Sequence, residues 1–184
     1  RDELSGTAGT DRRKIRSILL SGNEAKGKRF YQYTAIDEYS RWRYVEAFEE
    51  HSIYSSAVFL RYFLERFPMP VECVQTDNGI EFTKRFSTSR KETLTLFQRV
   101  LQEYGIRNKL IRHLPQGIMK IERSHRKDNE RFYASHTFYS FEDFSKQLKT
   151  YNHKDYNQFP MRPLGWKSPQ TILKEFIQYG VTYV

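Results

Sequence analysis

Two carboxylates in the sequence stand where they could do chemistry, Asp77 and Glu122. Asp77 follows the apolar run VECVQT (residues 71–76) and precedes the turn-forming pair Asn78-Gly79. A charge at the end of a buried strand costs solvation free energy unless it is paired or coordinated. The carboxyl ends of strands are also where open α/β sheets bind ligands. Glu122 stands near the start of a strongly basic segment, KIERSHRKDNERFYASH (residues 120–136).

Two carboxylates from separate elements, surrounded by basic residues, suit a hard divalent cation near phosphates. Mg²⁺ prefers oxygen ligands and is usually shared between a few carboxylates and the phosphates of the substrate. Simpler interpretations remain open for both residues. Asp77 could satisfy its own turn, and Glu122 could be a favourable charge in the first turn of a helix.

The basic residues predict an acidic partner. The formal net charge is +9 and the isoelectric point is about 9.6, which is typical of proteins that bind nucleic acid or an anionic membrane surface. The alternative is charge that serves solubility alone. We expect the DNA contacts on the helix predicted for the basic segment, residues 120–136: Lys120, Arg123, Arg126, Lys127 and Arg131. The alternative is that these residues form a solvated helix face.

Composition predicts one packed domain. The chain has 184 residues, of which 38% are hydrophobic and 16% aromatic. Cys73 is the single cysteine, so an intrachain disulfide and a cysteine-based zinc site are excluded. No apolar run reaches the roughly 20 residues of a membrane-spanning helix. We expect an intracellular protein with a flexible tail at residues 1–10 and one domain over residues 11–184.

The elements that must hold these residues follow from periodicity and end signals. Alternation over residues 29–48, broken at residues 37–40, predicts two strands joined by a turn. Helical spacing of apolar residues follows, with Ser52 as N-cap and Pro68 as terminator. Further strands are expected at residues 71–77 and 106–114, and further helices at residues 94–104, 120–136, 141–153 and 169–180. This order indicates an α/β domain with a mixed sheet.

Four stretches in this order, QYTAIDEYSR, QTDNGIEF, ERSHRKDNERFY and PLGWKSP, resemble the catalytic core of insertion-sequence transposases and retroviral-type integrases. The resemblance covers residues 11–170 and implies a ribonuclease H-like fold with an Asp-Asp-Glu metal site. By this resemblance the core would process 3′ ends and transfer strands of DNA as a homo-oligomer. Its cofactor would be Mg²⁺, with Mn²⁺ as substitute, and two ions are expected. Asp77 matches the second catalytic Asp and Glu122 the catalytic Glu.

The first catalytic Asp has two candidates. Asp11 is our choice because the family carries this residue on its first strand, and Asp37 in AIDEYSR is the alternative. The family typically has an Asn-Gly pair in the loop before the Glu, where this chain has Ile118 and Met119. This departure favours, as an alternative function, a DNA-binding domain with impaired catalysis. Another nuclease on the same fold is the third possibility.

Two further residues receive structural interpretations. His125 is expected at the surface of the basic helix, where a phosphate contact is the alternative. Trp166 is expected to anchor the last helix against the sheet.

Overall fold

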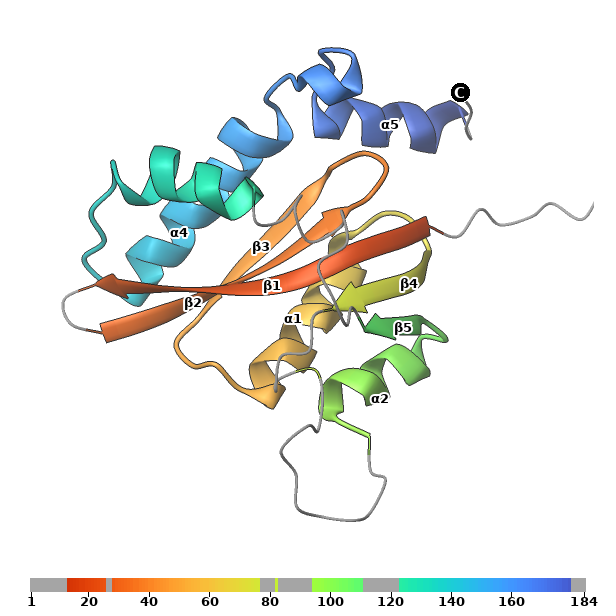
Figure 1. Cartoon of the computed structure of the whole chain (residues 1–184), viewed down its shortest axis with the longest axis horizontal. Helices are drawn as coiled ribbons and strands as arrows, with labels where there is room; N and C mark the ends of the chain where they lie inside the picture. Colours follow the sequence, from red (N-terminus) through yellow and green to blue (C-terminus); the bar gives the residue numbers. More distant parts are fainter. Residues whose placement is uncertain (1–12, 26–27, 77–81, 83–93, 111–122, 180–184) are drawn as a thin grey trace, which may run out of the picture.

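The computed structural model of the chain describes residues 13–25, 28–76, 82, 94–110 and 123–179 (Figure 1). Within these ranges five strands form one sheet: β1 (Arg13–Ala25), β2 (Lys28–Asp37), β3 (Arg43–Phe48), β4 (Val71–Thr76) and β5 (Arg107–Leu110). Its spatial order is β3-β2-β1-β4-β5. The pairs β1–β2 and β2–β3 are antiparallel, whereas β1–β4 and β4–β5 are parallel, so the predicted mixed sheet is confirmed.

Helices cover both faces of this sheet (Figure 1). In the described part of the chain the α-helices include α1 (Ile53–Arg66), α2 (Leu96–Glu103), α4 (Phe141–Tyr151) and α5 (Pro169–Tyr179). Shorter turns are π-helical at η1 (Asn129–Tyr133) and η2 (Asn152–Asn157) and 3-10 at η3 (Arg162–Leu164). Residues 123–128 are helical and lead directly into η1, and the whole segment 123–133 is called the basic helix below.

Helix ends lie where the sequence predicts them. The Ser52 hydroxyl accepts a hydrogen bond from the backbone N–H of Ser55 at 3.0 Å, which caps α1. Ser140 and Ser168 cap α4 and α5 in the same way. After α2, Gly105 has φ +65°, a conformation that glycine adopts without steric cost. The described helices include none that is long and apolar enough to cross a membrane.

The two faces of the sheet hold two aromatic cores, because side chains alternate along each strand. On one face, Tyr33 of β2 and Tyr44 of β3 pack on Phe59 of α1, with ring centroids 5.5 Å apart in each pair. The opposite face carries a second cluster made by the sheet, the basic helix and α4: Phe30, Val45, Ala47, Phe132, Phe138, Phe144, Leu148 and Tyr151. This second core fixes the basic helix against the sheet.

Candidate nucleic-acid interface and catalytic edge

The predicted catalytic and metal-binding residues Asp11, Asp77 and Glu122 lie outside the described residues, as does the predicted DNA contact Lys120. Ile118 and Met119 lie outside them too. These assignments therefore stay predictions. Among the residues that the structure does describe, no group of three His, Cys, Asp or Glu side chains could hold a metal ion.

The strand that leads to Asp77 ends in a buried residue. Thr76 is the last residue of β4 and is fully buried, and its Oγ1 atom has no hydrogen-bond partner among the described residues. On β1, Ile18 is the residue paired with Thr76. Phe82 is fully buried in the core, and its ring centroid lies 5.0 Å from that of Phe97. Asp77 thus follows a buried unpartnered hydroxyl, which suits a polar ligand at this edge.

Asp37, the alternative first carboxylate, holds a turn. It is 1% exposed, and its Oδ2 accepts hydrogen bonds from the backbone N–H and the hydroxyl of Ser40 at 2.8 and 2.6 Å. Asp37 pairs with Ile15 of β1, which in turn pairs with Val74 rather than with the end of β4. Its role in the structure is therefore to fix the turn between β2 and β3.

The register of β1 bears on Asp11. Arg13, the first residue of β1, pairs with Val71 at the amino end of β4. The carboxyl end of β4 is five residues further on, a distance of roughly 16 Å along a strand. The acidic residue within β1 itself is Glu24, next to the β1–β2 connection. The described part of β1 therefore supplies no carboxylate beside Thr76.

The basic helix presents two different faces. Arg123, Lys127 and Arg131 recur every four residues, so they share one face, and all three are exposed. Arg126 is exposed as well. The four described residues predicted to contact DNA are therefore accessible. The inner face carries the buried residues Ser124, Asp128 and Phe132, a division that the evenly spread charges of the sequence did not reveal.

A buried arginine ties this helix to the sheet. Arg43 of β3 is 0% exposed, and its Nη1 donates to both carboxylate oxygens of Asp128 at 2.8 Å and to the Ser124 hydroxyl at 2.6 Å. Its Nε donates to Asn152 Oδ1 at 2.7 Å, and its guanidinium lies 3.8 Å from the ring centre of Tyr156. Charge-assisted hydrogen bonds of this kind are strong. The Nη2 atom of Arg43 is buried without a hydrogen-bond partner among the described residues, so the network is not fully satisfied within them.

His125 faces inward, so the prediction of a surface histidine is wrong. Its Nε2 lies 3.2 Å from the hydroxyl of Thr34 on β2. Burial lowers the pKa of His125 from its ordinary value of 6.5 to about 4, with the nearby Asp128 opposing and Arg43 adding to the effect. At neutral pH the ring is uncharged and packs the helix on the sheet.

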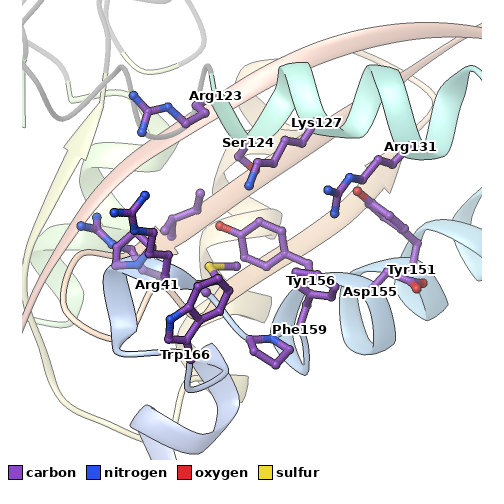
Figure 2. Close-up of a pocket in the computed structure, with 15 residues that line it drawn as sticks. Arg41, Arg123, Ser124, Lys127, Arg131, Tyr151, Asp155, Tyr156, Phe159 and Trp166 are labelled. Atoms are coloured by element: carbon purple, nitrogen blue, oxygen red, sulfur yellow. The ribbon is translucent and has the colours of Figure 1, made fainter.

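A cavity of about 460 Å³ opens beside the exposed face of the basic helix (Figure 2). Lys127 and Arg131 project into it from the helix, and Tyr156 and Phe159 lie on the opposite wall (Figure 2). We call this cavity the aromatic–cationic pocket. The side chains that give it this character are Arg41, Arg123, Lys127, Arg131, Arg162, Tyr151, Tyr156, Phe159 and Trp166.

Trp166 lines this pocket and does not anchor α5 as the sequence suggested. Its side chain is 70% exposed, and its backbone has φ +64°, directly after Gly165 at φ +61°. The left-handed turn directs the indole outward, which an apolar residue type could not indicate by itself. The face of Arg123, Lys127 and Arg131, together with this pocket, can hold a polyanion and offer flat surfaces to rings.

Solved structures similar to this chain define its class. The catalytic core domain of BIV integrase matches with a TM-score of 0.64 and 15% identity, covering 91% of this chain and 97% of that one. The HTLV-2 integrase catalytic core domain in complex with magnesium, in its trimeric form, matches with a TM-score of 0.62 and 15% identity, over 88% and 95% of the two chains. The sheet order and these matches define a ribonuclease H-like fold of the integrase-core type, as predicted.

The family follows from the sequence itself. The family model of the integrase core domain matches residues 20–114, more than half of the chain. The chain belongs to the integrase core domain family. A comparison with curated protein sequences finds no significant match.

Proposed function

We propose that this chain is the catalytic core of a DNA recombinase that cuts and joins DNA by metal-dependent attack on phosphodiester bonds. The observation that carries the proposal is the carboxyl end of strand β4 in the integrase-type sheet. This buried parallel strand ends at Thr76, and Asp77 is the next residue in the sequence. A carboxylate at the end of such a strand suits a ligand site.

Asp77 and Glu122 would hold the divalent metal ions. Asp11, the predicted third carboxylate, precedes Arg13, which pairs with Val71 at the amino end of β4, so metal binding by an Asp11 variant decides whether Asp11 takes part. Two carboxylates with phosphate oxygens and water suffice for Mg²⁺, so the residues present fit the ion. A bound divalent ion would activate the attacking oxygen and stabilise charge on the leaving oxygen.

The basic helix would position the DNA. Arg123, Lys127 and Arg131 share one exposed face, and contacts from such residues to phosphates orient a duplex without reading its sequence. The buried pair of Arg43 and Asp128 keeps this face in a fixed place relative to the sheet. The bound backbone would therefore meet the catalytic edge in one orientation.

We further propose that the working complex contains more than one copy of the chain on DNA inside the cell. Joining two ends of an element to a target requires two active sites held together. The HTLV-2 core solved with magnesium is described in a trimeric and a dimeric form, which supports self-association of cores of this fold.

Plasmid nicking and strand transfer of a labelled oligonucleotide, each with Mg²⁺ or Mn²⁺, test the proposal. The unmodified chain should give metal-dependent products, and Asp77→Asn should abolish them without altering the circular-dichroism spectrum. Glu103→Gln, which changes an exposed carboxylate on α2, is the matched control and should stay active. Equal activity of Asp77→Asn and the parent would contradict the proposal, and cleavage of an RNA–DNA hybrid alone would reassign it to a nuclease.

A DNA-binding domain without catalysis is the second candidate function. The pairing of β1 favours it, because Ile18 stands opposite Thr76 and Asp37 is engaged with Ser40. A chain of this kind should bind DNA equally well with Mg²⁺ and with EDTA. It should also give no product in the nicking assay at any metal concentration.

A further inference from the structure

The aromatic–cationic pocket contains the two strained residues of the described chain. Arg41 (φ 63°) and Trp166 (φ 64°) are the described non-glycine residues with positive φ, and both line this cavity. Residues other than glycine rarely adopt this backbone conformation because of its steric cost. Such strain persists where the surroundings enforce it, and it concentrates at binding sites.

Hydrogen bonds enforce both conformations. The backbone N–H of Arg41 donates to the carbonyl of Asp37 at 3.0 Å, in the turn that the Asp37 carboxylate also holds. The N–H of Trp166 donates to the carbonyl of Met161 at 3.0 Å, and Met161 and Lys167 pair as an isolated bridge. Two separate turns are thus built so that an arginine and a tryptophan meet the same cavity.

The aromatic lining is more exposed than packing alone would leave it. Trp166 is 70% and Phe159 49% exposed, and the guanidinium of Arg131 lies 5.6 Å from the ring centre of Phe159. Large apolar rings on a surface with cations around them are the arrangement by which proteins stack nucleic-acid bases.

The charge of the lining is equally one-sided. Five cationic side chains line the cavity: Arg41, Arg123, Lys127, Arg131 and Arg162. Asp155 is the acidic side chain among the described lining residues. The Nη1 atom of Arg41 is buried and has no hydrogen-bond partner in the described part of the chain. Such a surplus of donors calls for an anion.

We propose that the aromatic–cationic pocket receives one unpaired nucleotide of bound DNA. The base stacks on Trp166 and Phe159, and the phosphates meet the cations of the basic helix. The cavity of about 460 Å³ lies within the usual range of small-ligand sites. An acidic peptide would satisfy the cations but would leave the exposed rings without flat partners. The inference deepens the proposed function, since it takes DNA as the substrate.

Fluorescence anisotropy with EDTA tests this binding without catalysis. The affinity for a duplex with a short single-stranded overhang is divided by the affinity for the blunt duplex of the same sequence. The parent should prefer the overhang. Trp166→Ala should lower this ratio by about 5-fold to 150-fold, the effect expected from one stacked base, and Trp166→Tyr should restore most of it.

Arg126→Ala is the matched control, because Arg126 lies on the same helix but does not line the pocket. It should weaken both DNAs alike and keep the ratio. Circular dichroism checks that each variant is folded. Tryptophan emission comes from Trp42 and Trp166, so quenching by the overhang DNA in the unmodified chain but not in Trp166→Ala gives a second readout.

A ratio near one in the parent, or an unchanged ratio in Trp166→Ala, would overturn the inference while leaving the recombinase proposal standing. A parent that nicks no DNA but still prefers the overhang DNA would contradict the recombinase proposal and leave the inference about the pocket standing. If a free deoxynucleoside monophosphate competes as strongly as overhang DNA, the pocket binds free nucleotides and the inference is overturned. Tighter binding of an RNA overhang than of the DNA overhang would also overturn the inference.

Discussion

The buried pair of Arg43 and Asp128 makes the sharpest stability prediction. Asp128→Ala removes the two carboxylate oxygens that accept from Arg43 Nη1 and so leaves a buried guanidinium, 0% exposed, without its counter-charge. Breaking a buried ion pair in this way costs about 3–5 kcal/mol. A domain is stable by only about 5–15 kcal/mol, so the loss is large.

For a chain of 184 residues this corresponds to a fall in Tm of roughly 6–20 °C, taking about 2–4 °C per kcal/mol. Urea unfolding followed by circular dichroism measures the free energy directly. Glu103→Ala is the control, because it breaks an exposed ion pair: the side chain of Arg61 is 44% exposed and that of Glu103 is 53% exposed. That pair should contribute less than about 1 kcal/mol.

The double variant Arg43→Met, Asp128→Leu separates charge burial from packing. Replacing both partners by apolar residues should recover much of the loss, although Asn152 and Ser124 lose a donor. The reasoning is refuted if Asp128→Ala costs no more than Glu103→Ala. The same result would mean that the network does not hold the basic helix on the sheet.

Three further predictions concern pH, DNA and the β2–β3 turn. The pKa of His125 falls from 6.5 to about 4 on folding. The contribution of His125 to the free energy of unfolding should therefore be full above about pH 6.5 and decline by up to about 3 kcal/mol as the pH drops towards 4. Urea titrations of His125→Gln should show this decline largely removed. Lys127→Ala should weaken binding of all duplexes alike and reduce the slope of log K against log salt by about 1, and an unchanged slope would exclude a phosphate contact. Asp37→Ala should cost about 1–3 kcal/mol in urea unfolding, through the lost bonds from Ser40, yet leave Mn²⁺ affinity intact.

Local signals in the sequence predicted much of the fold. The cap at Ser52 lies where the sequence predicts it, and Pro169 and the left-handed Gly105 lie at ends of the predicted helices, because each acts within four residues of its own position. The strand before Asp77 is likewise confirmed up to Thr76. The family resemblance predicted the ribonuclease H-like fold, which the similar solved structures confirm.

Long-range features were beyond the sequence. The hydrogen bonds from Arg43 to Asp128 join residues 85 positions apart, and no local pattern marks Arg43 as buried. Trp166 was misassigned because its direction depends on a hydrogen-bonded turn and not on residue type. The register of β1 against β4, which decides which residue stands beside Thr76, also depends on pairing that hydrophobic alternation leaves open.

The most direct test of the recombinase account is Mn²⁺ binding by titration calorimetry. The parent chain is compared with Asp11→Asn, Asp37→Asn, Asp77→Asn and Glu122→Gln. The account predicts binding by the parent, loss of it in the Asp77 and Glu122 variants, and retention in the Asp37 variant. Weaker binding by the Asp11 variant would add Asp11 to the site. A parent that binds no metal, or four variants that bind like the parent, would contradict the account and leave a DNA-binding core in its place.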